Sequence, residues 1–176
     1  MRASKTKILK KFIQDLLPFL LLLLGLWVIT KLGYRITYVS SISMPEGWYW
    51  LVPTQKIQRY DMVAFTPPLK AQDFLTQRHW GPKSNQMMKY VMGIPGDFVC
   101  NYQQVLWINR QKIAPILRVY APHQPLPQSN FCGYLKPSQY MLLSTKIEHS
   151  FDSRYFGPVE RGNIIAKAIP IFSKKP

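Results

Sequence analysis

An apolar run near the N-terminus constrains this chain more than any other feature. Residues 16–30 are almost wholly apolar, and extending the run back to Phe12 gives 19 residues. A helix that spans a bilayer needs about 20 residues, with a range of about 17–25. A removable secretory signal has a shorter apolar core and a cleavage site of small residues, but no alanine stands between Ser4 and Val63. We therefore expect residues 12–31 to form an uncleaved transmembrane anchor.

The basic residues around this run predict its orientation. Five of the 23 lysines and arginines lie within the first eleven positions, whereas Lys31 and Arg35 follow the run. Positive charge accumulates on the cytoplasmic side of membrane helices. We therefore expect residues 1–11 to be a cytoplasmic basic tail of a single-pass inner-membrane protein. Residues 32–176 would then form a periplasmic domain.

The whole chain carries 23 basic and 8 acidic residues, which gives a formal net charge of +15. An excess of this sign favours anionic partners, either lipid head groups or nucleic acid. The sequence holds no zinc-finger, homeodomain or RNP pattern. Because an apolar anchor is present, we expect the lipid bilayer to be a partner and expect no nucleic acid.

Beyond the anchor, the sequence predicts short strands. Residues 35–39 are β-branched and alternating, and a Pro-Glu-Gly turn separates them from the aromatic run 48–52. Further strands are expected at 61–65, 86–92, 105–108, 111–113, 140–144 and 164–171, with 105–113 as a hairpin. A loop with a short helix is expected at 69–84, and a proline-rich loop at 122–130. The predicted fold class is a mostly β domain on one N-terminal transmembrane helix.

Ser43 is the first candidate for chemistry. It follows the expected strand 35–39, precedes the Met44-Pro45 turn, and lies about a dozen residues beyond the anchor. Because a dozen extended residues reach at most ~40 Å, Ser43 can meet a membrane-tethered substrate near the membrane surface. The alternative is a structural serine in a polar turn.

Lys89 is the candidate base, since a serine needs a base to become a nucleophile. Strand alternation puts Met87, Lys89 and Val91 on one face, and apolar surroundings disfavour a charged amine. Lowering the pKa of a lysine from about 10.4 to roughly 7.5 costs about 4 kcal/mol, which a folded core must supply. The alternative is an exposed lysine at a strand edge.

Two other pairs of residues have more than one interpretation. Asp152 and Arg154 are two apart, so they pair on one strand face or form a salt bridge in a surface turn, worth under ~1 kcal/mol. Cys100 and Cys132 form either a disulfide or two separate buried thiols. A disulfide would close a 32-residue loop and stabilise the domain by roughly 3–4 kcal/mol on the chain-entropy model. The cysteines and the three scattered histidines show no metal-ligand spacing, so we expect neither metal nor cofactor.

Four motifs then occur in a fixed order along the chain. They are Ser-x-Ser-Met-Pro at 41–45, Arg-Tyr-Asp-Met-Val-Ala-Phe at 59–65, Lys-Tyr-Val-x-Gly-Ile-Pro-Gly-Asp at 89–97 and Ser-x-Asp-Ser-Arg-Tyr-Phe-Gly at 150–157. Together they resemble the motifs of bacterial type I signal peptidases, the peptidase S26 family. The resemblance extends from about Ser41 to Ala168 and implies a signal peptidase I-like β domain.

The resemblance implies a role for each of the following residues: Ser43 is the nucleophile, Lys89 the general base, the Ser43 N–H and Ser41 hydroxyl the oxyanion hole, Ser150 a hydrogen-bond partner of the lysine, and Asp152 and Arg154 the structural support of their strand.

Within this family, the sequence of residues 44–49 and 150–159 is similar to that of the TraF-type peptidases of conjugative transfer systems. The segment from Ser144 to His149 replaces the usual Gly-Asp-Asn. The TraF-type enzymes mature pilin precursors, and in some systems they join the pilin ends into a ring. The resemblance therefore implies a serine endopeptidase whose partners are a pilin precursor, the lipid bilayer and components of a conjugative type IV secretion system. It also implies that Asp152 is required for function.

Other functions fit parts of the sequence. A general type I signal peptidase would remove signal peptides from many exported preproteins, and a broad substrate range would identify it. A non-catalytic component of a transfer machine would not need both Ser43 and Lys89. A LexA-like repressor would need a DNA-binding helix-turn-helix in place of the anchor. A penicillin-binding enzyme would need Ser-x-x-Lys on a domain helix, whereas the one such pattern runs from Ser4 to Lys7 in the tail.

Four residues beside the nucleophile are expected to face substrate or membrane: Met44, Pro45, Trp48 and Trp50. Aromatic side chains are favoured in the head-group layer, so Trp48, Tyr49 and Trp50 either enter that layer or pack in the core. The basic surplus would hold the same face to anionic lipid.

Overall fold

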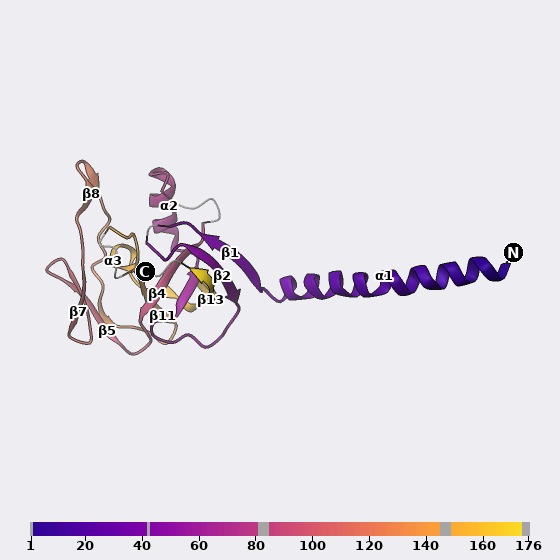
Figure 1. Cartoon of the computed structure of the whole chain (residues 1–176). Coiled ribbons are helices and arrows are strands. Elements are labelled where there is room, and N and C mark those ends of the chain that lie inside the picture. The colour runs from indigo at the N-terminus through magenta and orange to yellow at the C-terminus, as the bar shows by residue number, and fades with distance from the viewer. Residues whose placement is uncertain (1, 42, 81–84, 145–148, 174–176) are drawn as a thin grey trace. The chain divides into compact units, whose positions relative to one another are not determined.

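The computed structural model describes residues 2–41, 43–80, 85–144 and 149–173, with side chains from Lys10 onward (Figure 1). The chain divides into two compact units, Met1–Arg35 and Ile36–Pro176. The Thr145–Glu148 part of the segment that replaces Gly-Asp-Asn lies outside the described residues, as do residues 81–84 of the loop expected at 69–84.

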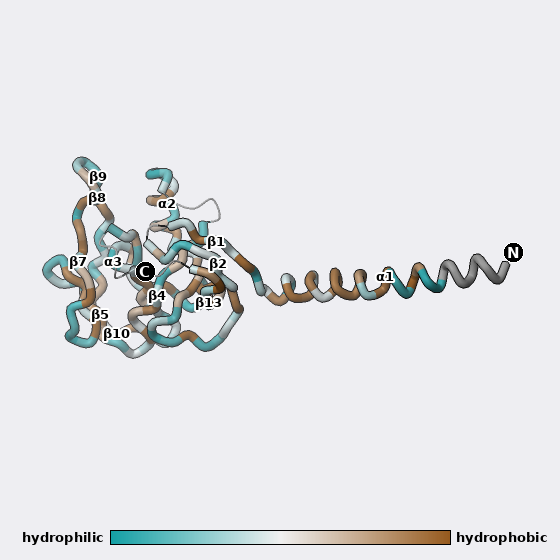
Figure 2. The backbone as a smooth tube through the Cα atoms, viewed as in Figure 1, coloured by the Kyte–Doolittle hydropathy of each residue, from teal (hydrophilic) through white to brown (hydrophobic). Residues whose placement is uncertain are grey.

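The first unit is the helix α1 (Arg2–Lys31). Its segment Lys10–Lys31 is 22 residues long with a mean hydropathy of 2.2, and none of its most apolar window is buried within the protein. Figure 2 shows the apolar residues as a nearly continuous stretch of this helix. Length and composition therefore make α1 a candidate membrane span, which is consistent with a single-pass membrane protein. The expected anchor, residues 12–31, is helical throughout.

The second unit is built around a seven-stranded sheet in the order β1-β2-β13-β3-β4-β11-β12. Its strands are β1 (Arg35–Val39), β2 (Gly47–Val52), β3 (Met62–Phe65), β4 (Met87–Gly93), β11 (Gln139–Leu143), β12 (Val159–Glu160) and β13 (Ile164–Ser173). The long β13 pairs antiparallel with both β2 and β3, and its register shifts in each pairing. Such irregularities bend a sheet, so one strand can border two parts of a curled sheet. The fold class is mostly β, as predicted.

A smaller sheet has the order β10-β5-β6-β7, and β8 pairs with β9 beside it. The bounds are β5 (Phe98–Tyr102), β6 (Val105–Ile108), β7 (Gln111–Pro115), β8 (Val119–Ala121), β9 (Gln124–Pro125) and β10 (Cys132–Tyr134). The predicted hairpin is β6–β7, where Asn109 and Arg110 have φ of 49° and 66°, the geometry of a two-residue hairpin turn. Cys100 and Cys132 are register partners on β5 and β10 and are joined by a disulfide.

Strand alternation builds the core. In β2, Tyr49 and Leu51 are buried while Trp48 and Trp50 are exposed. The strands β3 and β11 lie inside the larger sheet, and β3 is buried along its whole length. Burial of a large apolar side chain contributes roughly 1.5–3 kcal/mol, so these inner strands hold the sheet together.

Some elements differ from the sequence-based expectations. The short helix expected within residues 69–84 is confirmed as α2 (Leu69–Gln77), but β9 lies within the proline-rich stretch predicted as a loop. The last motif is not a strand. Asp152 caps the short helix α3 (Ser153–Phe156) by accepting the Arg154 N–H, because a carboxylate at this position satisfies an N–H that the first turn leaves unpaired.

Candidate active site

Ser43 lies in the connection between β1 and β2, and its neighbours fix that connection to the core. Met44 is buried, and its N–H donates to the Ser41 carbonyl. The hydroxyl of the buried Tyr49 donates to the Pro45 carbonyl at 2.7 Å. Ser43 itself is half-buried. The loop is therefore anchored on both sides of a serine that keeps access to solvent.

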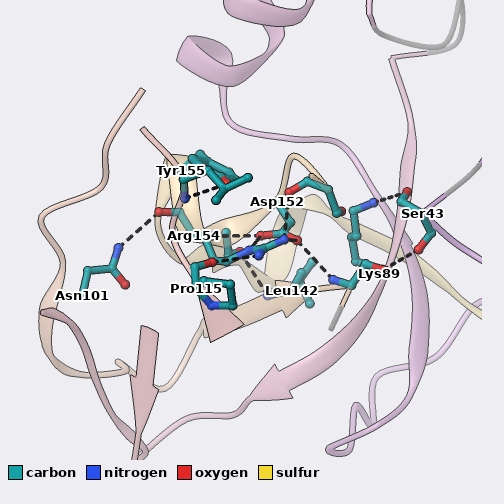
Figure 3. Close-up of polar contacts among 12 residues, drawn as sticks. Ser43, Lys89, Asn101, Pro115, Leu142, Asp152, Arg154 and Tyr155 are labelled. Carbon is teal, nitrogen blue, oxygen red and sulfur yellow. Dashed lines mark hydrogen bonds and ion pairs between the residues drawn. The ribbon is translucent and has the colours of Figure 1, made fainter. Parts of the chain in front are cut away.

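Lys89 reaches Ser43 from β4, in the middle of the larger sheet. Its Nζ lies 2.6 Å from Ser43 Oγ, and the residue is 2% exposed (Figure 3). Burial lowers the pKa of Lys89 to about 8; the Asp152 carboxylate opposes this shift and the Arg154 guanidinium reinforces it. Loss of hydration disfavours the charged amine more than the nearby carboxylate favours it. The arrangement brings a serine hydroxyl to an amine that is available in its neutral form.

The two residues that the resemblance assigns to an oxyanion hole lie next to each other. The Ser43 N–H donates to Ser41 Oγ at 3.2 Å, and the Oγ atoms of Ser41 and Ser43 are 2.8 Å apart. Both donors therefore lie beside the serine oxygen that would attack a carbonyl. An incoming oxygen could replace the Ser41–Ser43 hydrogen bond.

Asp152 and Arg154 form a buried ion pair close to Lys89. Arg154 Nε donates to Asp152 Oδ1 at 2.8 Å and Nη2 donates to Oδ2 at 2.9 Å, with both side chains at most 1% exposed. Arg154 also donates to the carbonyls of Ser150 and Pro115, each at 2.9 Å. Figure 3 shows these two side chains pointing at each other. The surface salt bridge considered from the sequence is therefore wrong: the pair is buried and anchors several segments.

Ser150 does not make the expected hydrogen bond to Lys89 in this structure. Its Oγ is buried and has no hydrogen-bond partner within the described part of the chain. Its carbonyl is held by Arg154, and Lys89 directs its amine to Ser43 instead. Ser150 still lines the same cleft as Ser43 and Lys89.

Ser144 was not singled out as a functional residue from the sequence. It follows the last residue of β11 and is 2% exposed. Its hydroxyl donates to the carbonyl of Ser43, and its N–H donates to Asp152 Oδ2 at 3.2 Å. The sequence does contain one signal that could have identified it: Ser144 directly follows an apolar strand, at a position where another apolar residue would extend the core.

The remaining predicted residues divide between the cleft and the outer surface. A cleft of about 660 Å³ contains Ser43, Lys89 and Met44, with Trp80 and Tyr120 also on its wall. Pro45 lies in the loop after Met44. Trp48 and Trp50 point away from the core, with 48% and 45% of their surface exposed, whereas Tyr49 is fully buried. The head-group interpretation therefore fits the two tryptophans, and core packing is correct for Tyr49.

Comparison with known proteins gives the class. The model of the family described as "Signal peptidase, peptidase S26" matches residues 9–173, nearly the whole chain. The chain therefore belongs to the signal peptidase family, peptidase S26, and its class is that of a peptidase.

Within the known proteins, the chain is similar to plasmid transfer proteins. It is 27% identical over 144 residues to a plasmid transfer protein TraF of Escherichia coli, a match that covers 76% of this chain and 81% of the relative. It is 24% identical over 160 residues to the conjugal transfer protein TraF of Agrobacterium fabrum, covering 82% and 85%. The crystal structure of a signal peptidase I from Enterococcus faecalis also matches, at 22% identity and a TM-score of 0.39, over 65% of this chain and 98% of that one.

Proposed function

We propose that this protein is a membrane-anchored serine endopeptidase in which Ser43 is the nucleophile and Lys89 the general base, and that it matures a membrane-tethered conjugative pilin precursor. The observation that carries the proposal is the 2.6 Å contact between Lys89 Nζ and Ser43 Oγ, made by a buried lysine with a pKa of about 8. With that pKa, about a tenth of the enzyme would hold a neutral lysine at pH 7. A general base with a pKa near the working pH is effective.

The reaction would be an acyl transfer. Neutral Lys89 accepts the Ser43 proton while Oγ attacks the scissile carbonyl carbon, and the carbonyl oxygen becomes an oxyanion. The Ser43 N–H and the Ser41 hydroxyl would donate to that oxyanion; loss of one such donor typically costs about 10²–10³ in rate. Protonated Lys89 then gives its proton to the leaving amine, which leaves an acyl-enzyme on Ser43.

The acyl-enzyme has two possible acceptors. Water, deprotonated by Lys89, releases a linear product and restores the free hydroxyl of Ser43. An amine of the pilin itself, if it attacks before water does, forms a new amide and gives a cyclic product. The same proton transfers at Lys89 serve both routes, so the outcome depends on which acceptor reaches the cleft.

The exposed surface of the larger sheet supports a location at the membrane. Trp48 and Trp50 project from β2, and Phe172 on the paired β13 is 76% exposed. Aromatic side chains are favoured at the head-group level. We propose that this face enters the head-group layer and that α1 anchors the chain with its N-terminus in the cytoplasm and its catalytic domain in the periplasm. A tethered precursor would then present its cleavage site to the cleft.

The similarity to the TraF proteins supports a pilin precursor as the substrate, with components of a conjugative secretion system as partners. The test is intact mass spectrometry of a candidate pilin precursor co-expressed with the wild-type protein, with Ser43→Ala or with Ser138→Ala. Ser138 donates to Glu160 near the β11–β12 edge and serves as a matched serine control.

We expect shortened pilin with the wild-type protein and Ser138→Ala, and intact precursor with Ser43→Ala. A product lighter by one further water would show cyclisation. Shortened pilin with Ser43→Ala would exclude Ser43 as the nucleophile. Cleavage of many unrelated preproteins would instead identify a general signal peptidase.

A further inference from the structure

The neighbouring strands β4 and β11 each place a side chain at or directly beyond the strand against Ser43, the proposed nucleophile. The antiparallel pairing of β11 with β4 places Leu143 opposite Tyr90. Ser144 directly follows β11 and Lys89 directly precedes Tyr90 in β4, so both lie next to the Leu143–Tyr90 pair, toward the same end. Lys89 bonds the side chain of Ser43 and Ser144 bonds its main chain, so the nucleophile is held at two points.

Ser144 is in turn held by the buried ion pair. Its N–H donates to Asp152 Oδ2, and the Asp152 carboxylate is fixed by three N–H groups of Arg154. Arg154 is anchored to the carbonyls of Ser150 and Pro115. A continuous set of hydrogen bonds therefore runs from the ion pair through Ser144 to the Ser43 carbonyl.

We infer that Ser144 is a positioning residue for the proposed reaction: its hydroxyl fixes the Ser43 peptide plane and transmits the rigidity of the Asp152–Arg154 pair to the nucleophile. This inference rests on the proposed function. The bond to the Ser43 carbonyl restricts rotation about the Ser43 Cα–C bond. That restriction holds the Ser43–Met44 peptide in one orientation while Lys89 holds Oγ, and the two contacts together limit how far Ser43 can move from its base.

The geometry also explains how Asp152 could be needed for activity without touching the reacting atoms. Its carboxylate accepts hydrogen bonds from Ser144 and Arg154, whereas Lys89 bonds Ser43. A carboxylate held in this way sets the position of the Ser144 backbone. The Ser144 hydroxyl, which donates to the Ser43 carbonyl, then holds Ser43 in place relative to that carboxylate.

The test compares Ser144→Ala and Ser144→Thr with the wild-type full-length protein, using steady-state cleavage of the precursor and thermal unfolding. A small misplacement of a catalytic group can cost about 10²-fold in rate. We expect Ser144→Ala to lower kcat by about 10- to 100-fold with KM changed less than about twofold, because the cleft that binds substrate is intact. Ser144→Thr keeps a hydroxyl and should restore most of kcat.

Ser153→Ala is the matched control. Ser153 is fully buried and its Oγ accepts the Leu142 N–H at 3.0 Å, but it does not bond Ser43. We expect this variant to lower the melting temperature while kcat stays close to that of the wild type. A purely structural role for Ser144 predicts instead that both variants lose stability and activity in parallel.

The outcomes separate this inference from the proposed function. Unchanged kcat in Ser144→Ala, with Ser43→Ala inactive, would overturn the positioning role and leave the proposed nucleophile in place. Full activity of Ser43→Ala would overturn both. A loss of kcat in Ser144→Ala that Ser144→Thr does not restore, accompanied by an equal loss of stability in both, would also reject positioning by the hydroxyl.

Discussion

Lys89 and Arg154 are both buried cations in the same domain, with exposures of 2% and 1%, but their surroundings differ. Arg154 donates to the Asp152 carboxylate and to two carbonyls, so its charge is matched by acceptors. Lys89 donates to a neutral hydroxyl, and burial lowers its pKa to about 8. Burial with charged and polar acceptors keeps the Arg154 charge in place, whereas burial lowers the pKa of Lys89 toward the range that the proposed general base needs.

The proposed base and the residue that stabilises the fold are therefore two different buried cations of the same domain. Removing the amine of Lys89 should abolish the proposed reaction and stabilise the fold, whereas removing the guanidinium of Arg154 should destabilise the fold first.

Replacing Lys89 by methionine should reduce the cleavage rate by more than about 10³-fold, because the proposed base is lost. The same change should raise the free energy of unfolding at pH 7. The folded pKa of about 8 lies below the value of 10.5 for a free lysine, so below pH 8 burial of the charged amine costs about 3 kcal/mol. That cost declines as the pH rises from 8 to 10.5.

Cleavage assays and chemical denaturation at pH 7 and pH 10.5 would measure both parts. The stability gain of Lys89→Met should be largest at pH 7 and small at pH 10.5. An active variant would contradict the general-base role, and a variant less stable than the wild type at pH 7 would contradict the destabilising burial.

Replacing Arg154 by methionine should destabilise the domain by about 3–5 kcal/mol, because the Asp152 carboxylate would remain buried without its partner. Lys167→Met is the matched control. Lys167 pairs with Asp61, but its side chain is 35% exposed, so its loss should cost under about 1 kcal/mol. Denaturant unfolding of both variants measures the difference. Equal losses of unfolding free energy would show that the buried Asp152–Arg154 pair stabilises the domain no more than the more exposed Lys167–Asp61 pair does.

The pH dependence of cleavage should show the smallest effect, about tenfold per pH unit. As the pH rises toward 8, kcat/KM should increase with an apparent pKa of about 8 and then level off, because the neutral form of Lys89 is the active one. The melting temperature over the same pH range controls for unfolding. An inflection near 10.4 would show that burial does not lower the pKa of Lys89, and one near 6.5 would point to a histidine base.

Several strands and one hairpin of the domain could be predicted because the information for them is local. The alternation in β2 and the turn residues between β6 and β7 are readable within a few positions. The short strands β9 and β12, two residues each, carry too little pattern to be recognised. The Asp152–Arg154 motif was identified, but its helical capping and complete burial depend on the segments that pack over it.

The sequence by itself determined the apolar span, the mostly β class and the residue types available for acyl transfer, because hydrophobic length, alternation and side-chain chemistry are properties of short segments. The tertiary structure alone decided which groups meet. Lys89 lies 46 residues from Ser43 and Ser144 lies 101 residues from it. The pairing of β4 with β11 brings both to Ser43, and only a complete core buries the amine deeply enough to lower its pKa.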